Sequence, residues 1–515
     1  MIRCFRHSLN LLVLLLVLTS CGKTKVEHDI LNYSTLELPE RPNIVWIVAE
    51  DLSPYIPTFG DSTVQTPNIS RLAKEGITYS NLFSPSGVCA PSRAAIATGM
   101  YPTRIGAQHM RTGPWFRFTT TDKALENYAK YGRLAYEAMP PDGTHMLSTY
   151  LREAGYYCIN NPKEDYQFRC EMTAWDESGF EAHWKNRKKD QPFFAIFNID
   201  VTHESMIWRK LKDSLFVDEN LDVPVPPYLP DTDIAKQDIR RMYSNIVEMD
   251  IRVGEILKEL EDQNLLENTI VFWYTDHGGP MPRQKRTVFE SGIHVPMIVR
   301  FPNKQLEGKT DDQLLSFIDL MPTTLSSVGI QPPLDIDGKA WLGEYKKEKK
   351  RKYIFAAADR FDNETDRIRA VRDHQFKLIK NYNTNQSYYL PIKYREEMPI
   401  MHELLKLEQE GKLTKEQKLW FKKNKDSIEL YDILNDPHEL NNLARNKDFK
   451  EKIAELSSAL DEWIKQTNDK GMIPEQEYIE SIWPNGNQLI TESPEVIVEG
   501  NKIILTTSTR EASIG

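Results

Sequence analysis

The chain has 515 residues, of which 40% are apolar and 27% are charged, a composition that is ordinary for a soluble folded enzyme. That length is too great for one simple domain. The formal net charge of −10 argues against nucleic acid as a partner, because binding to phosphates requires a basic surface.

Residues 1–20 have the pattern of a secretory signal. Arg3 and Arg6 precede an apolar run, residues 11–18, that is too short to span a bilayer comfortably. The run ends in Leu-Thr-Ser-Cys, which resembles a bacterial lipobox. This resemblance implies cleavage before Cys21 and attachment of palmitate or a similar lipid to its thiol. The protein would then be lipid-anchored in the cell envelope, at the outer membrane surface or the periplasmic face. An ordinary signal peptide with an incidental cysteine is the alternative. Residues 21–40 are polar and are interpreted as a tether.

Four apolar runs predict strands that are buried on both faces of a parallel sheet. They are residues 43–49, 192–200, 269–275 and 295–301. An apolar stripe from Ile239 to Leu260 at alternating three- and four-residue spacing predicts a long helix, and residues 144–154 and 317–328 are also predicted to be helical. Strands alternating with helices indicate an α/β fold, with a large, mixed and mostly parallel sheet between layers of helices. Three of the runs end in polar residues, at the edge where such sheets bind ligands.

The pattern changes near residue 369. Residues 369–380 partly alternate between polar and apolar, as in a half-exposed antiparallel strand, and residues 449–466 are predicted to form a helix. We therefore expect a catalytic domain over residues 41–368 and a smaller α+β subdomain over residues 369–515. Of the five cysteines, Cys158 and Cys170 are either bridged or buried as free thiols, and both alternatives stay open.

The most specific motif is Cys89-Ala90-Pro91-Ser92-Arg93, followed by Thr98-Gly99. With Ala90 left out as variable, average residue usage would produce the other six positions in about one in a hundred thousand chains of this length. The motif resembles the signature of the type I sulfatases, within the alkaline phosphatase superfamily. That resemblance implies an alkaline phosphatase-like fold and oxidation of Cys89 to 3-oxoalanine (formylglycine) by a formylglycine-generating or anaerobic sulfatase-maturating enzyme. One hydroxyl of the hydrated aldehyde would attack sulfur, and the second would later expel sulfate. Arg93 would hold the hydrated aldehyde by charge-assisted hydrogen bonds.

The resemblance also implies one Ca²⁺ per chain, bound by the modified Cys89 and by residues that follow two of the predicted strands. These are Glu50 and Asp51 after the first strand and Asp276 and His277 after a later one. A hard cation prefers such oxygen ligands and would neutralise charge on the sulfate. The family usually has Asp-Asp where this chain has Glu50-Asp51, so the role of Glu50 is open.

Two further positions match the family pattern by their order in the chain. Lys285, within Arg-Gln-Lys-Arg-Thr-Val-Phe-Glu-Ser-Gly, is similar to a sulfate-binding lysine, and His203 is similar to the histidine that faces the leaving oxygen.

A Lys-x-His element of the family is only half present. Lys163 matches the lysine, but Asp165 stands where the histidine is expected. Either Asp165 takes the proton or His109 replaces the histidine. Asp165 and His109 are thus candidate substrate-binding residues, together with Arg111.

The C-terminal segment at residues 429–444 also resembles the corresponding segment of sulfatases. The resemblance is strongest to the branch that includes N-sulfoglucosamine sulfohydrolases, which implies a sulfated polysaccharide or oligosaccharide as substrate, either a glycosaminoglycan or an algal polymer such as ulvan. The alternatives are a sulfamidase, a phosphonate monoester or phosphodiester hydrolase, and an inactive carbohydrate-binding lipoprotein.

Overall fold

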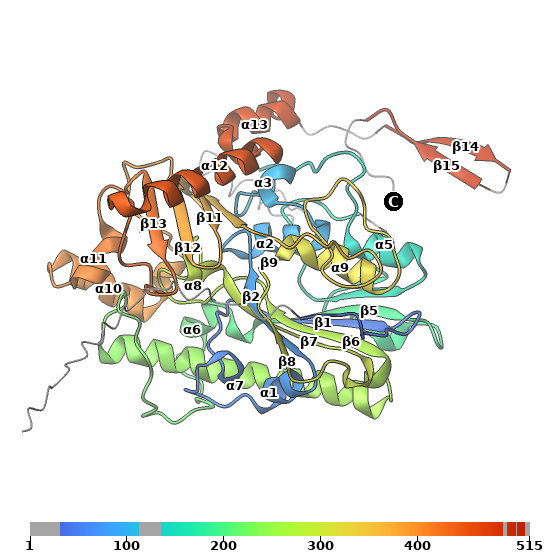
Figure 1. The fold of residues 1–515 in the computed structure, drawn as a ribbon, viewed down its shortest axis with the longest axis horizontal. Helices are drawn as coiled ribbons and strands as arrows, with labels where there is room; N and C mark the ends of the chain where they lie inside the picture. The colour runs from blue at the N-terminus through green and yellow to red at the C-terminus, as the bar shows by residue number, and fades with distance from the viewer. Residues whose placement is uncertain (1–30, 113–134, 172, 488–491, 501, 510–515) are drawn as a thin grey trace, which may run out of the picture.

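A computed structural model of the protein describes residues 31–112, 135–171, 173–487, 492–500 and 502–509 (Figure 1). The predicted signal over residues 1–20, the lipidation site Cys21 and the first part of the predicted tether lie outside the described residues. Within the described part of the chain, no helix combines the length and apolar character needed to cross a membrane.

The main sheet contains nine strands in the order β4-β3-β5-β1-β6-β7-β2-β8, with β9 also paired to β2. Strand β7 runs antiparallel to β6 and β2, and the other pairings are parallel, which confirms the predicted mixed, mostly parallel sheet. The four predicted strands correspond to β1, β5, β6 and β7. The strands are β1 (Asn43–Ala49), β2 (Ile77–Phe83), β3 (Tyr157–Asn161), β4 (Glu177–Ser178), β5 (Phe193–Ile199), β6 (Thr269–Thr275), β7 (His294–Arg300), β8 (Lys309–Asp311) and β9 (Leu315–Ser316).

Strand β1 shows why the central strands are continuously apolar. Successive side chains of a strand point to opposite faces, and all seven residues of β1 are buried. Val45, Ile47 and Ala49 enter one hydrophobic cluster, whereas the residues that alternate with them enter another on the opposite face. Both faces of the sheet therefore need a helical cover.

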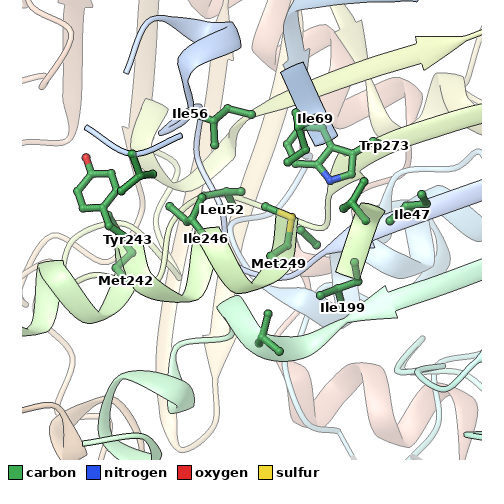
Figure 2. Close-up of a cluster of buried hydrophobic side chains, with 14 of the residues drawn as sticks. Ile47, Leu52, Ile56, Ile69, Ile199, Met242, Tyr243, Ile246, Met249 and Trp273 are labelled. Carbon is green, nitrogen blue, oxygen red and sulfur yellow. The ribbon is translucent and has the colours of Figure 1, made fainter. Parts of the chain in front are cut away.

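The long helix α7 (Asp233–Asp262) and α1 (Pro67–Lys74) cover one face. Thr232 caps α7, because its side chain accepts a hydrogen bond from Ala235 N. The predicted apolar stripe of α7 includes Ile246 and Met249, which belong to one hydrophobic cluster with Leu52, Trp273 of β6 and Ile47 of β1 (Figure 2). Burying each such side chain contributes roughly 1.5–3 kcal/mol, so this layer anchors the sheet.

The opposite face carries α2 (Cys89–Thr98), α3 (Pro102–Ile105), α5 (Leu147–Glu153) and α9 (Leu320–Ser327), which Figure 1 shows above the sheet. Helices α5 and α9 lie inside the two segments predicted to be helical, and a short 3-10 turn, Phe317–Asp319, precedes α9. All ten residues of α2 are buried, so this helix packs tightly between the sheet and α9.

The C-terminal subdomain is a four-stranded antiparallel sheet with helices. Its strands are β10 (Ile354–Phe361), β11 (Glu364–Arg372), β12 (Phe376–Asn381) and β13 (Ile428–Asp432), in that order. Its helices are α10 (Pro399–Gln409), α11 (Lys415–Phe421), α12 (Lys450–Gln466), which matches the predicted helix, and α13 (Glu475–Ile482). A hairpin of β14 (Glu495–Glu499) and β15 (Lys502–Thr506) projects from the body (Figure 1).

The predicted boundary between residues 368 and 369 falls inside β11. Strand β10 pairs with β11 along its length, so the antiparallel sheet already begins at Ile354. The run Ala356-Ala357-Ala358 in β10 contains no β-branched or aromatic side chain, and the usual sequence signal for a strand is therefore weak there.

Candidate active site

Three neighbouring parallel strands end at the same level. Ala49, the last residue of β1, pairs with Ile199 at the end of β5 and with Thr275 at the end of β6. The residues that follow these strands therefore meet at one edge of the sheet, as expected for the carboxyl ends of parallel strands.

Cys89, the first residue of α2, lies at this edge. Its Sγ is 3.2 Å from Nε2 of His277 and 4.0 Å from Oδ1 of Asp51. His277 Nε2 is also 3.1 Å from Asp51 Oδ1 and 3.6 Å from Asp276 Oδ1. All four residues are buried, and one ligand atom from each lies within 4.8 Å of the others. The structure thus brings together four of the five predicted metal-binding residues.

This donor set fits a divalent cation. Two buried carboxylates, an imidazole nitrogen and the position-89 side chain converge, and hard cations take carboxylate oxygens as ligands. Burial alone would lower the pKa of His277, but Asp276, the Cys89 thiolate and Asp51 raise it to about 10. The same negative field that holds a proton on the imidazole would hold a cation there.

Arg93 fixes Asp276 in this cluster. Its Nη2 and Nε donate to Asp276 Oδ2 at 3.0 and 3.2 Å, and its Nη1 donates to Asn198 Oδ1 at 2.5 Å. Burial opposes the charge, yet Asp276 and Glu50 raise the Arg93 pKa above its ordinary value. Arg93 therefore stays charged, and Asp276 Oδ1 is left to face His277.

Glu50 does not belong to the group of ligand atoms around Cys89. Its Oε1 lies 2.9 Å from Lys163 Nζ and 3.4 Å from Arg93 Nη2. A second group of candidate ligand atoms does join Glu50 to Asp51 and His203. Burial raises the pKa of Glu50, and the nearby cations act against that shift. In this structure Glu50 neutralises Lys163.

Lys285 occupies the other side of Asp51. Its Nζ donates to Asp51 Oδ2 at 2.7 Å and lies 3.1 Å from His203 Nε2. Burial and the nearby charge of Lys285 lower the pKa of His203. The predicted pair of a sulfate-binding lysine and a proton-donating histidine is thus side by side.

Two buried residues that no sequence motif singled out, Glu204 and Arg286, lie beside this pair. Glu204 Oε1 and Oε2 accept hydrogen bonds from the two terminal nitrogens of Arg286 at 2.6 and 2.7 Å, and Glu204 N donates to Asp51 Oδ2 at 2.7 Å. Their position next to His203 and Lys285 in the chain was the available signal. The pair orients Asp51 and adds no net charge.

Lys163 and Asp165 project to the same side of their segment. Lys163 Nζ lies 3.8 Å from Asp165 Oδ2, whereas the carboxylate of Glu164 contacts Ser178 and Cys170 instead. Asp165 is 9% exposed, and its Oδ1 is buried without a hydrogen-bond partner. Among the described acidic residues around Cys89, Asp165 therefore has the loosest contact with a cation.

Arg111 lies near Asp165 and forms an ion pair with Asp362 at 2.9 Å. Burial would lower the pKa of Arg111, but Asp362 and Asp165 raise it, and the charge on Cys89 contributes. Arg111 and Asp165 have positive φ angles of 58° and 52°, and Asp51 of the cation cluster has one of 48°. Non-glycine residues in this conformation are strained, and such strain concentrates at functional sites.

His109 lies apart from these groups. Its Nδ1 accepts a hydrogen bond from Arg360 N at 3.3 Å, and its nearest charges are Glu475, Arg360 and Arg369 of the C-terminal part. Burial lowers the pKa of His109 to about 3. The structure therefore places the His109 imidazole in contact with Arg360 of β10.

Cys158 and Cys170 are both free and buried. The Cys158 thiol donates to Ser148 O at 3.6 Å, and that of Cys170 lies 3.2 Å from Glu164 Oε2. Of the two alternatives, the structure has the free thiols.

Two family models match parts of this chain. The family model described as Sulfatase matches residues 42–330, and that described as N-sulphoglucosamine sulphohydrolase, C-terminal, matches residues 283–419. The chain is 48% identical to an ulvan-active sulfatase of Formosa agariphila, over 99% of this chain and 90% of that protein. It is 24% identical to human N-sulphoglucosamine sulphohydrolase, over 83% and 90% of the two chains.

The fold is shared with a solved structure titled as a complex with its substrate D-glucosamine-2-N,6-O-disulfate. The TM-score is 0.57 at 18% identity, over 83% of this chain and 98% of the other. The chain belongs to the sulfatase family, near the N-sulphoglucosamine sulphohydrolases, and is a sulfuric ester hydrolase.

Proposed function

We propose that this enzyme removes sulfate ester groups from a sulfated polysaccharide or its oligosaccharides, with ulvan as the first candidate. The observation that carries the proposal is the convergence of Cys89 with Asp51, Asp276 and His277 within 4.8 Å. The 48% identical relative is named for its activity on ulvan, which supports that substrate. Glycosaminoglycans are the second candidate.

The proposal includes formylglycine at position 89 and one Ca²⁺ beside it. Asp51, Asp276, His277 and the position-89 side chain would hold the cation, with Glu50 outside this set. Calcium supplies charge neutralisation, and formylglycine supplies an oxygen nucleophile with a second hydroxyl. A formylglycine-generating or anaerobic sulfatase-maturating enzyme would carry out the oxidation.

The cations around Cys89 would bind the sulfate group. Lys163 and Lys285 are both close enough to lower the pKa of the Cys89 thiol against the effect of burial. The same field would attract a sulfate ester placed at this position. His203, beside Lys285, would donate a proton to the leaving sugar oxygen.

Asp165 would accept a proton during sulfate release, and Arg111 would bind an anionic or hydroxyl group of the sugar. Asp165 Oδ1 is buried and has no hydrogen-bond partner, so this oxygen is open to a proton while Oδ2 lies 3.8 Å from Lys163 Nζ. We also propose that lipid on Cys21 anchors the enzyme in a bacterial cell envelope, where large sulfated polymers are accessible.

The test is sulfate release from a panel of substrates. The panel contains ulvan oligosaccharides, O-sulfated and N-sulfated glucosamine derivatives, and a phosphonate monoester. We expect release from O-sulfated sugars, fastest from ulvan, and none from Cys89→Ala. Preference for the N-sulfated sugar would instead support a sulfamidase, which the match at residues 283–419 also favours. Hydrolysis of the phosphonate alone would contradict the proposal.

A further inference from the structure

The C-terminal segment at residues 429–444, which includes Glu439, has no part in the chemistry proposed above. It nevertheless lies against the loop that carries Lys285. This loop, residues 276–293, connects β6 to β7 and ends in the short helix α8 (Glu290–Ile293). Lys285 reaches from its middle toward Asp51. The position of the Lys285 ammonium therefore depends on what holds residues 283–290.

Four charged side chains, two of each sign, meet at this contact. Lys377 of β12 is fully buried, and its Nζ lies 2.7 Å from Glu290 Oε1 and 2.9 Å from Glu439 Oε1. Arg372 of β11 contacts Glu290 Oε2 at 2.5 Å. Charges this deeply buried are stable only when they are paired, so the four side chains hold one another in place.

This charged cluster, Lys377, Arg372, Glu290 and Glu439, also binds the backbone of the loop. Lys377 Nζ donates to Val288 O at 2.9 Å, and Glu439 Oε2 accepts from Glu290 N at 2.6 Å. Together they fix the loop on the C-terminal side of Lys285.

Arg283 fixes the other side of Lys285. Its two terminal nitrogens donate to the carbonyl oxygens of His438 and Glu439 at 2.9 and 3.0 Å. Its guanidinium also lies 4.0 Å from the ring centre of Phe289. Lys285 is therefore located between two attachments to the C-terminal subdomain.

The same loop packs against the segment before Cys89. Arg286 N donates to Gly87 O at 2.6 Å, and a Cβ atom at Gly87 would lie 2.2 Å from Thr287 O. Glycine is required for this close approach. A shift of residues 283–290 would consequently move Lys285 relative to Cys89.

We infer that Lys377 and Glu439 are positioning residues, which place the Lys285 ammonium where it binds the sulfate group of the substrate. The inference rests on the proposed function in one respect, the assignment of sulfate binding to Lys285. It gives the C-terminal subdomain a role in sulfate recognition, although neither residue contacts the site itself.

A double-mutant cycle tests the inference. Lys285→Ala, Lys377→Met and the double variant are compared by kcat, by KM for a sulfate ester and by the inhibition constant of inorganic sulfate. We expect Lys377→Met to raise KM and the inhibition constant by about tenfold in the native background, and to have less than about a twofold effect when Lys285 is absent. Equal factors in both backgrounds would show a purely structural role and overturn the inference.

Lys380→Met is the matched control, because Lys380 lies on the same strand but pairs with the exposed Asp461. It should leave both constants unchanged. Glu439→Gln is the second variant, and its cycle with Lys285→Ala decides the question if Lys377→Met fails to fold. A glutamine can still accept from Glu290 N but removes the charge beside Lys377, so a smaller, Lys285-dependent effect is expected. If Lys285→Ala itself binds sulfate normally, the assignment of sulfate binding to Lys285 in the proposed function is wrong. That outcome is distinct from failure of the positioning inference, which the double-mutant cycle decides.

Discussion

Sγ of Cys89 lies 3.2 Å from Nε2 of His277, although 188 positions separate the two residues. The contact arises because α2 begins where β6 ends, and because Gly278 O, 3.0 Å from Nδ1, orients the imidazole. It places the first residue of the signature motif directly against the candidate cation ligands. The proposed chemistry depends on this arrangement.

Replacing Cys89 with alanine should lower sulfate release by a factor of about 10³ or more, because no nucleophile remains. Ion chromatography of released sulfate measures the effect. Cys158→Ala is the control, since Cys158 is another buried free thiol but lies in β3 and packs in a hydrophobic cluster. Mass spectrometry of the wild-type peptide should show the aldehyde at position 89. An unmodified thiol in fully active enzyme would refute the assigned nucleophile.

Removing divalent cations should lower both activity and Tm, and added Ca²⁺ should restore them. Without a cation, the buried carboxylates of Asp51 and Asp276 lose a stabilising partner, and a ligand at 100 times its Kd contributes about 2.7 kcal/mol. Asp276→Asn should weaken cation binding, as measured by elemental analysis and by the Ca²⁺ dependence of Tm. Asp200→Asn is the control, because Asp200 also follows a strand of this edge but is exposed. A Tm indifferent to chelation would contradict the cation site.

Asp165→Asn should lower kcat by about 10²- to 10⁴-fold if Asp165 accepts a proton in catalysis. Asparagine tolerates the left-handed backbone conformation at this position, so the change mainly removes the charge. Asp165→His should keep more activity than Asp165→Asn, since histidine can also take a proton.

Glu164→Gln is the neighbouring control, because that carboxylate contacts Ser178 and Cys170 instead. Steady-state kinetics over a range of pH distinguishes the two possible roles of Asp165. A rise in KM alone for Asp165→Asn would mean that Asp165 only binds the substrate.

The carboxyl group of Asp238 on α7 should make the protein less stable as the pH rises from about 4 to about 7. Burial raises its pKa from 3.8 to about 7, while the hydrogen bond from Ile400 N, 2.7 Å from Oδ2, acts in the opposite direction. The folded state then keeps a proton that the unfolded chain releases near pH 4, so stability decreases with pH over this range by up to about 4 kcal/mol.

Asp238→Asn removes this titration. Relative to wild type, the variant should be more stable at pH 8 than at pH 5, as shown by Tm measured at both values. An asparagine Oδ1 can still accept the hydrogen bond from Ile400 N, so the comparison isolates the charge. Parallel pH profiles for the two proteins would contradict the raised pKa.

Much of the framework could be predicted from local patterns. The apolar runs predicted β1, β5, β6 and β7, and the stripe from Ile239 to Leu260 predicted α7, because burial on one or two faces imposes a period on the chain itself. Strand β10 was not predicted in this way, since three consecutive alanines follow Ile354 and Phe355 and weaken the strand signal.

The sequence by itself determined the sulfatase motif at Cys89 and the residues that follow the strands, because strand ends and short motifs are local. Only the tertiary structure decided how those residues are paired. It turned Glu50 toward Lys163, placed His109 against Arg360, and brought Glu204 to Arg286. Each of these pairings depends on which charged or polar group lies within a few ångströms after folding. The partners are far apart in the chain, so only the folded structure sets the distance between them.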